Sequence, residues 1–199
     1  MEQVLAAMAA SSHGVVTRGE LLRAGISAEE IRGRLLTGAL LLEHRGVYRV
    51  GHRAPSIEAT YLAAVRACGE GALLSGRAAG HLLGALKGPP PPPEVTARTE
   101  RRISGITTRR ERNLDPRDAT TWRAIPVTTV ARTLVDLAAV LAPDDLARAC
   151  HEAAIRHGTT PAHVEAVLAG ARPAPAPPTC AASCAATSTS PSAPSRPAS

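Results

Sequence analysis

The side chains that could do covalent or metal chemistry are few and poorly placed for it. Ser75 follows two leucines but lacks the flanking glycines of a nucleophile elbow, so we expect it to cap a helix instead. His151, His157 and His163 are spaced six residues apart, which rotates them off a shared helical face. The sole lysine, Lys87, precedes a proline run, where it cannot complete a nuclease core of Asp, Glu and Lys. The sequence therefore predicts no catalytic residues, no metal site and no cofactor.

Arginine side chains offer a different chemistry, the binding of phosphate groups. Residues 98–112 carry six arginines against Glu100 and Glu111, a local net charge of +4 in a chain of net charge +6. A guanidinium group can bind a phosphate through two parallel hydrogen bonds, and neutralising phosphates drives binding to nucleic acids. The segment is a candidate second basic patch, although such a cluster can also be a solvated polar face. Its arginines are Arg98, Arg101, Arg102, Arg109, Arg110 and Arg112.

Two capping boxes near the N-terminus predict helices that could present residues to DNA. Thr17 stands three residues before Glu20, and Ser27 three residues before Glu30. In this arrangement each side chain accepts a hydrogen bond from the other residue's backbone at a helix start. Gly25 can end the first of these helices in the left-handed conformation. Two short helices joined by a tight turn form a helix-turn-helix.

A hairpin is expected after the second of these helices. Residues 40–42 and 47–50 are short apolar segments on either side of a turn that contains glycine. With the opening helix, these elements describe a winged helix at residues 1–54. Ile31 and Leu35 would face its interior, which leaves the opposite face of their helix for the major groove of duplex DNA. The predicted DNA-binding residues are Arg32, Arg34 and Thr37 on this helix and His44, Arg45 and Arg49 on the wing. Arg34 could instead pair with Glu30.

The rest of the chain up to residue 170 predicts a second, small α+β unit, at residues 55–170. Helices are expected from residue 56 to 68 and 75 to 86, and strands at 94–97, 103–108 and 125–127. Val130, Leu134, Leu137 and Leu141 repeat at helical spacing, and two more helices should end near Gly158 and by residue 170. The fold class is therefore α+β.

The last segment, residues 171–199, is almost entirely Pro, Ala, Ser and Thr, so we predict a disordered tail. No apolar run approaches the length needed to span a bilayer, and no basic region precedes the Ala-rich N-terminus. The four cysteines are too few and too scattered for a disulfide framework in a chain of 199 residues. We expect a soluble, cytoplasmic protein that does not interact with membranes.

Besides the opening helix, four short motifs, taken in their order and spacing, point to a known family. They are His13-Gly-Val-Val-Thr-Arg18, His44-Arg-Gly-Val-Tyr48, Leu74-Ser75 with the helix after it, and residues 125–137. Together they resemble the N-terminal regulatory part of AbiEi-family type IV antitoxins, over about residues 1–168. The resemblance implies a winged helix that represses its own operon, and a remaining part that neutralises a nucleotidyltransferase-type toxin. Similar proteins often continue into a DUF559-type nuclease domain, but here the Pro- and Ala-rich tail takes its place.

The leading hypothesis is a non-enzymatic transcriptional regulator and antitoxin that binds duplex DNA at its own operator. Two alternatives stay open. The chain could be a protein-interaction module that docks a toxin without DNA. The acidic Glu29 and Glu30 on the predicted recognition helix favour this alternative. It could also be the remnant of a DUF559-type nuclease that has lost its catalytic domain.

Overall fold

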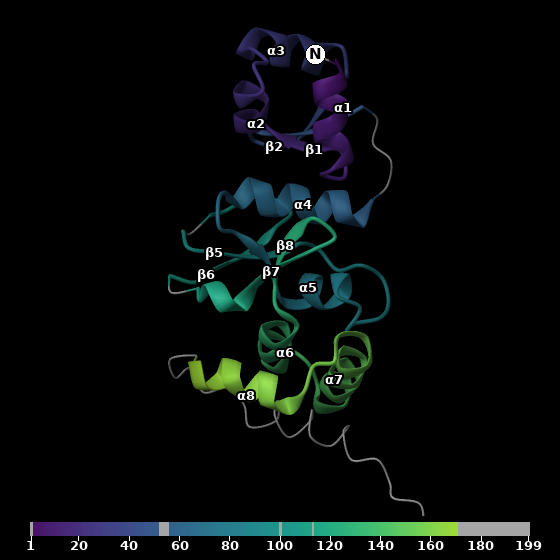
Figure 1. Cartoon of the computed structure of the whole chain (residues 1–199), viewed down its shortest axis with the longest axis vertical. Helices are drawn as coiled ribbons and strands as arrows, with labels where there is room; N and C mark the ends of the chain where they lie inside the picture. The colour runs from purple at the N-terminus through teal and green to yellow at the C-terminus, as the bar shows by residue number, and fades with distance from the viewer. Residues whose placement is uncertain (1, 52–55, 100, 113, 171–199) are drawn as a thin grey trace, which may run out of the picture.

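The computed structural model describes residues 2–51, 56–99, 101–112 and 114–170 (Figure 1). The fold is α+β, as predicted, with one sheet of three strands in the order β1-β3-β2 and one of five in the order β6-β5-β4-β8-β7. The boundary expected between residues 54 and 55, and the tail predicted at residues 171–199, lie outside the described residues.

The N-terminal unit is a winged helix. Both predicted capping boxes are present: the hydroxyls of Thr17 and Ser27 accept hydrogen bonds from the N–H groups of Glu20 and Glu30, whose carboxylates accept from the cap residues. Strand β1 was not predicted, and it pairs antiparallel with β3 to extend the wing hairpin into a sheet. The elements are α1 (Glu2–Ala10), β1 (Val15–Thr17), α2 (Arg18–Arg23), α3 (Ala28–Leu36), β2 (Leu40–His44) and β3 (Val47–Val50).

The two faces of the winged-helix sheet pack against different parts of the molecule. One face joins Leu21, Ile26 and Ile31 in the core of the winged helix itself. Because side chains alternate along a strand, Val15 and Val47 point to the other face, where they enter the core around α4 (Ile57–Cys68). The winged helix and the second unit therefore share a continuous apolar core, with α4 lying directly under the wing sheet (Figure 1).

Polar contacts reinforce this junction at two further places. Arg66 of α4 donates hydrogen bonds to the carbonyl oxygen of Val15 and to Glu20. On the second unit, the two-residue turn between β7 and β8 has φ angles of 48° at Arg123 and 60° at Ala124. The carbonyl oxygen of Arg123 lies 2.6 Å from Nε2 of His13. The guanidinium group of Arg123 lies 2.9 Å from the carboxylate of Glu58 on α4. The turn therefore touches both the winged helix and the helix beneath it.

A mixed five-stranded sheet forms the middle of the second unit, with α4 on one side and α5 (Gly76–Leu82) on the other (Figure 1). Strand β4 pairs antiparallel with β5 and parallel with β8. The strand predicted at residues 103–108 is displaced, because Ile103 and Ile106 close a turn as an isolated bridge and the strand begins only after it. The strands are β4 (Leu73–Leu74), β5 (Glu94–Ala97), β6 (Thr107–Arg110), β7 (Ala119–Trp122) and β8 (Ile125–Thr128).

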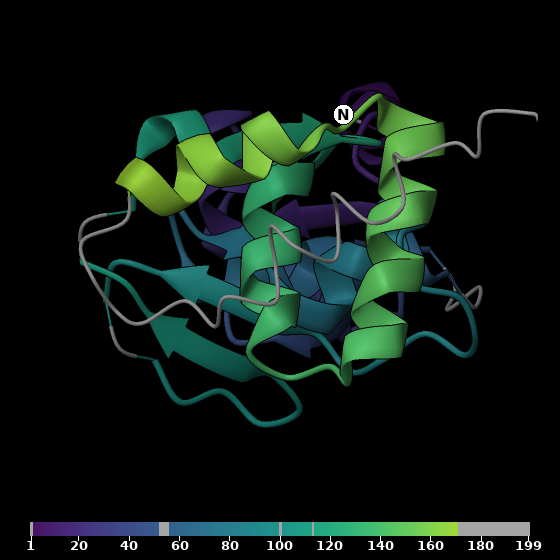
Figure 2. The ribbon, with the colours of Figure 1, turned by 90° about the horizontal axis from the view of Figure 1, so that it is seen from below.

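Three helices form the layer farthest from the winged helix. They are α6 (Val130–Ala138), α7 (Pro143–His157) and α8 (Pro161–Gly170), and all three were predicted. Figure 2 shows this layer from below, with α6 and α7 side by side. Leu134, Leu137, Leu146 and Val164 are fully buried between them. The periodic leucines of α6 therefore face this helical core.

Two helical glycines should respond in opposite ways to replacement by alanine. A Cβ at Gly80 of α5 would lie 3.1 Å from atoms of Leu86 and of the fully buried Leu137, whereas a Cβ at Gly33 of α3 would meet nothing within 4 Å. We expect Gly80→Ala to lower the free energy of unfolding by about 1–3 kcal/mol through overpacking. Gly33→Ala should raise it by about 0.5–1 kcal/mol, because alanine favours the helix. Chemical denaturation measures both changes. A Gly80→Ala variant as stable as Gly33→Ala would contradict the close packing of α5 against α6.

Candidate nucleic-acid interface

Helix α3 presents one face to the core and leaves the opposite face open to solvent. Ile31 is buried and Leu35 is half-buried, whereas Arg32, Gly33 and Thr37 are exposed. The spacing of the apolar residues predicted this orientation. The side chains of Arg32 and Thr37 are therefore accessible to a ligand that lies along the helix.

Arg34 is less accessible than its neighbours on α3. Its side chain is 18% exposed, and its Nη1 lies 2.7 Å from Oε1 of Glu2 on α1. Glu30, the partner considered from the sequence, uses its carboxylate to accept the backbone N–H of Ser27, and the hydrogen bonds with Ser27 lower the pKa of Glu30. An Arg34 contact with a base would therefore compete with the ion pair to Glu2.

The wing exposes Arg45 but not Arg49. Arg49 is only 7% exposed, and its Nε lies 3.1 Å from Oε1 of Glu43. The prediction that Arg49 contacts phosphates is therefore wrong. Arg49 stands opposite Val15 in the sheet register and two residues after Val47, so it shares the face that packs toward α4.

His44 and Arg45, at the turn of the wing, lie against the second unit. His44 is half-buried, and burial lowers the pKa of its imidazole although the charge of Glu43 opposes this. These two residues line a pocket together with Arg101 and Arg102 from the loop between β5 and β6. The structure thus brings part of the second basic patch next to the wing.

The other arginines of that patch do not belong to the lining of this pocket. Arg109 of β6 has its Nη1 3.3 Å from Oδ1 of Asp136, so part of its charge is neutralised. The remaining members are exposed, and they are Arg98, Arg110 and Arg112. The segment predicted as one basic patch therefore supplies separate groups of arginines with different surroundings.

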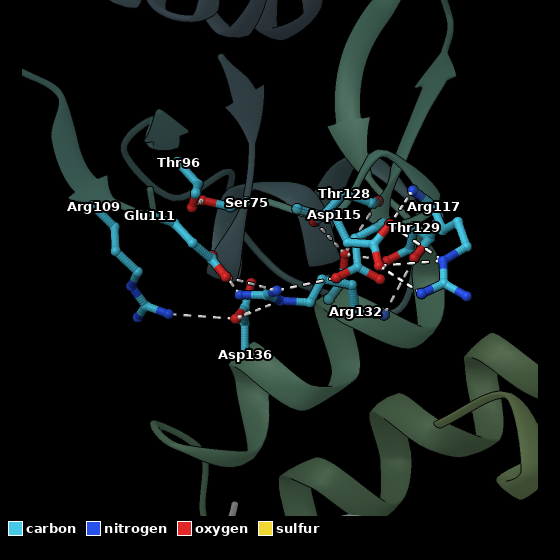
Figure 3. Close-up of polar contacts among 12 residues, drawn as sticks. Ser75, Thr96, Arg109, Glu111, Asp115, Arg117, Thr128, Thr129, Arg132 and Asp136 are labelled. Atoms are coloured by element: carbon cyan, nitrogen blue, oxygen red, sulfur yellow. Dashed lines mark hydrogen bonds and ion pairs between the residues drawn. The ribbon is translucent and has the colours of Figure 1, made fainter. Parts of the chain in front are cut away.

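A charged network around Arg132, which the sequence analysis did not single out, joins three parts of the second unit (Figure 3). The guanidinium group of Arg132 on α6 donates hydrogen bonds of 2.6 and 3.1 Å to Glu111 after β6. It also lies 3.1 Å from Asp118 and 3.3 Å from Asp136. The spacing of Arg132 and Asp136, one helical turn apart in the motif at residues 125–137, was the signal that could have identified the pair.

Burial dominates the electrostatics of this network. The side chain of Asp136 is 5% exposed, and burial raises the pKa of its carboxyl group although Arg132 and Arg109 oppose the shift. Burial alone would lower the pKa of Arg132, but hydrogen bonds to Glu111 and the nearby negative charges raise it overall. All the charged groups in the network are engaged with one another, so its arrangement is that of a structural cross-link.

The residues considered for catalysis or metal binding have other contacts. Ser75 is the N-cap residue of α5, but it makes no side-chain capping bond; its Oγ accepts a hydrogen bond of 2.9 Å from the hydroxyl of Thr96. His157 has Nε2 2.7 Å from the carbonyl oxygen of Leu83. In the described ranges, no three His, Cys, Asp or Glu side chains gather in a group that could hold a metal ion. Those ranges also contain no helix that combines the length and the apolarity needed to cross a membrane.

Comparison with known proteins gives a likeness at the level of fold. No protein-family model matches the sequence, and no curated protein matches it. The crystal structure of the protein RV2827C from Mycobacterium tuberculosis is similar, with a TM-score of 0.59 and 18% sequence identity. The likeness covers 94% of this chain and 76% of that chain. It shows that the arrangement of elements described here occurs in a solved protein.

Proposed function

We propose that this chain binds duplex DNA through its winged helix and acts as a non-enzymatic transcriptional regulator and antitoxin. The observation that carries the proposal is the open face of α3, with exposed Arg32 and Thr37, in the same domain as a wing turn that exposes Arg45. A helix of this kind can enter the major groove, where arginine reads guanine, while the wing holds the phosphate backbone. Arg32 and Thr37 would contact base edges, and Arg45 would contact phosphate.

The resemblance to AbiEi-type antitoxins supports the regulatory part of the proposal. It makes the DNA of the chain's own operon the first partner to test, and a nucleotidyltransferase-type toxin the second. Such a system works in the cytoplasm and needs no membrane partner. The second unit, which carries the motif at residues 125–137, would contact the toxin.

Replacing single arginines should separate phosphate contacts from base contacts. Arg45→Ala should weaken binding to all duplexes alike and reduce the slope of log affinity against log salt by about 1, because one phosphate contact is lost. Arg32→Ala should cost about 1–3 kcal/mol on the preferred duplex and little on random DNA. The measurement is a titration against upstream and random duplexes at several salt concentrations.

Arg148→Ala is the matched control for this titration. Arg148 is an exposed arginine on α7, in the helical layer farthest from the winged helix, so its removal changes the net charge equally without touching the proposed interface. Equal affinities and slopes for wild type, Arg32→Ala, Arg45→Ala and the control would reject DNA binding by the winged helix.

A second candidate function, docking of a protein partner, has a specific observation in its favour. Leu36 at the end of α3 is 84% exposed and Leu42 on β2 is 55% exposed. Apolar side chains exposed together with the acidic Glu29 and Glu30 suit a protein partner better than a phosphate backbone. Leu36→Lys distinguishes the two functions, because the added positive charge should tighten DNA binding if this face meets DNA. Unchanged DNA affinity with loss of toxin co-purification would favour docking.

A further inference from the structure

A cationic pocket of about 630 Å³ lies where the wing meets the second unit. The wing turn, the loop between β5 and β6, and Ala67 of α4 all contribute to its lining. The polar residues that line it are His44, Arg45, Thr99, Arg101, Arg102 and Ser104. Three of these residues are arginines, so the described lining contributes positive charge and hydroxyl groups.

Local contacts hold the loop that carries Arg101 and Arg102. The hydroxyl of Thr108 donates a hydrogen bond to the carbonyl oxygen of Arg101, and the bridge between Ile103 and Ile106 closes the loop. The guanidinium group of Arg101 lies over Gly69 at the end of α4, where a Cβ would stand only 3.1 Å from its Nη2. The loop is therefore closed by its own contacts, and Arg101 is kept beside α4.

We propose that this pocket binds a backbone phosphate of the same DNA duplex, just beyond the stretch that the wing contacts. The proposal rests on DNA binding by the winged helix. Its main support is that Arg45 belongs to the wing turn and to the pocket, so a backbone that meets Arg45 continues toward Arg101 and Arg102. Guanidinium groups bind phosphates bidentately, and each strand of a duplex places one phosphate in about every 3.4 Å of helix axis.

The openness of the site favours a strand over a small molecule. Arg45, Arg101 and Arg102 are all exposed, as are Thr99 and Ser104. A pocket for a small ligand usually encloses most of the ligand's surface among apolar side chains. A groove of exposed cations instead matches a polyanion that passes through it.

The test measures how DNA affinity depends on duplex length, in the wild-type protein and in a variant that lacks the pocket arginines. Wild-type protein is titrated with a duplex of about one helical turn, roughly 10 bp, and with one extended by a second turn on the wing side. The extension should steepen the slope of log affinity against log salt by about 2. Between 50 and 200 mM salt, the long duplex should therefore lose roughly tenfold more affinity than the short one. The variant Arg101→Ala/Arg102→Ala should lose this increment and bind the short duplex as wild type does.

The matched control is Arg110→Ala/Arg112→Ala, which removes the same charge from exposed arginines outside the pocket lining. This control should keep most of the increase in salt slope that the longer duplex gives in the wild type. If wild type binds DNA but the Arg101→Ala/Arg102→Ala variant keeps the full increment, the pocket proposal is wrong and the proposed function stands. If wild type binds neither duplex, both proposals fall. A labelled mononucleotide that binds wild type but not the pocket variant, without any length increment, would assign the pocket to a free nucleotide and overturn the proposal.

Discussion

Replacing Arg132 with alanine is expected to lower the free energy of unfolding by about 3–5 kcal/mol, the cost of removing one partner from a buried ion pair. The side chain of Arg132 is 13% exposed and pairs with Glu111, Asp118 and Asp136. Without it, the buried carboxylate of Asp136 keeps, within the described part of the chain, the ion pair with Arg109, whose side chain is 52% exposed and 3.3 Å away. Chemical denaturation at neutral pH measures the loss.

Arg117→Ala is the control for this variant. Arg117 also forms an ion pair, with Asp115 at 2.8 Å, but its side chain is 85% exposed. Water already solvates these charges, so their separation should change stability far less. A loss for Arg132→Ala no larger than that for Arg117→Ala would contradict the view that the Arg132 network is buried.

The effect of Arg132→Ala should also depend on pH. Burial already raises the pKa of Asp136 in the wild type, and removal of Arg132, the cation that opposes this shift most strongly, should raise it further. A carboxyl group with a higher pKa in the folded chain than in the unfolded chain favours folding when it takes up a proton. The stability gap between wild type and variant should therefore narrow as the pH falls from about 7 to about 5. A gap that widens over this range would contradict the assignment.

Replacing Leu21 with alanine should lower the free energy of unfolding by about 2–5 kcal/mol, because the side chain is fully buried in the core of the winged helix. The sole tryptophan, Trp122, lies on β7 in the second unit and reports unfolding of that unit by its fluorescence. Because Val15 and Val47 join the core around α4, the loss should shift the Trp122 transition as well.

Leu22→Ala is the matched control, since this neighbouring leucine is 44% exposed. It should change stability much less than Leu21→Ala. If helical circular dichroism is lost at lower denaturant in Leu21→Ala while the Trp122 transition is unchanged, the two units unfold independently. That outcome would contradict the shared core.

Elements with local signals could be predicted from the sequence. The capping boxes at Thr17 and Ser27 rest on contacts within four residues, and the leucines of α6 repeat along one face. Strand β1 carries no such signal, because it is three residues long and its partner β3 lies about 30 residues further along the chain. Its existence depends on tertiary packing.

The same distinction explains which site residues were found. The exposure of Arg32 and Thr37 followed from the helical spacing of Ile31 and Leu35. The face that Arg49 occupies depends on the position of α4, which the sequence of the wing does not reveal. The pocket joins the wing turn to a loop more than 50 residues away, so its arginines were seen only as separate clusters.

Under the proposed DNA binding, the turn at Arg123 and Ala124 limits how the protein can follow a duplex. Together with the shared core and Arg66, its contact with His13 fixes the orientation of the winged helix on the second unit. The wing and the pocket are therefore held at a fixed separation. A duplex that contacts both must bend to reach them. Bending is easiest at pyrimidine–purine steps such as TA and CA. Preferred sites should then carry such steps beside the wing, at base pairs that no side chain touches.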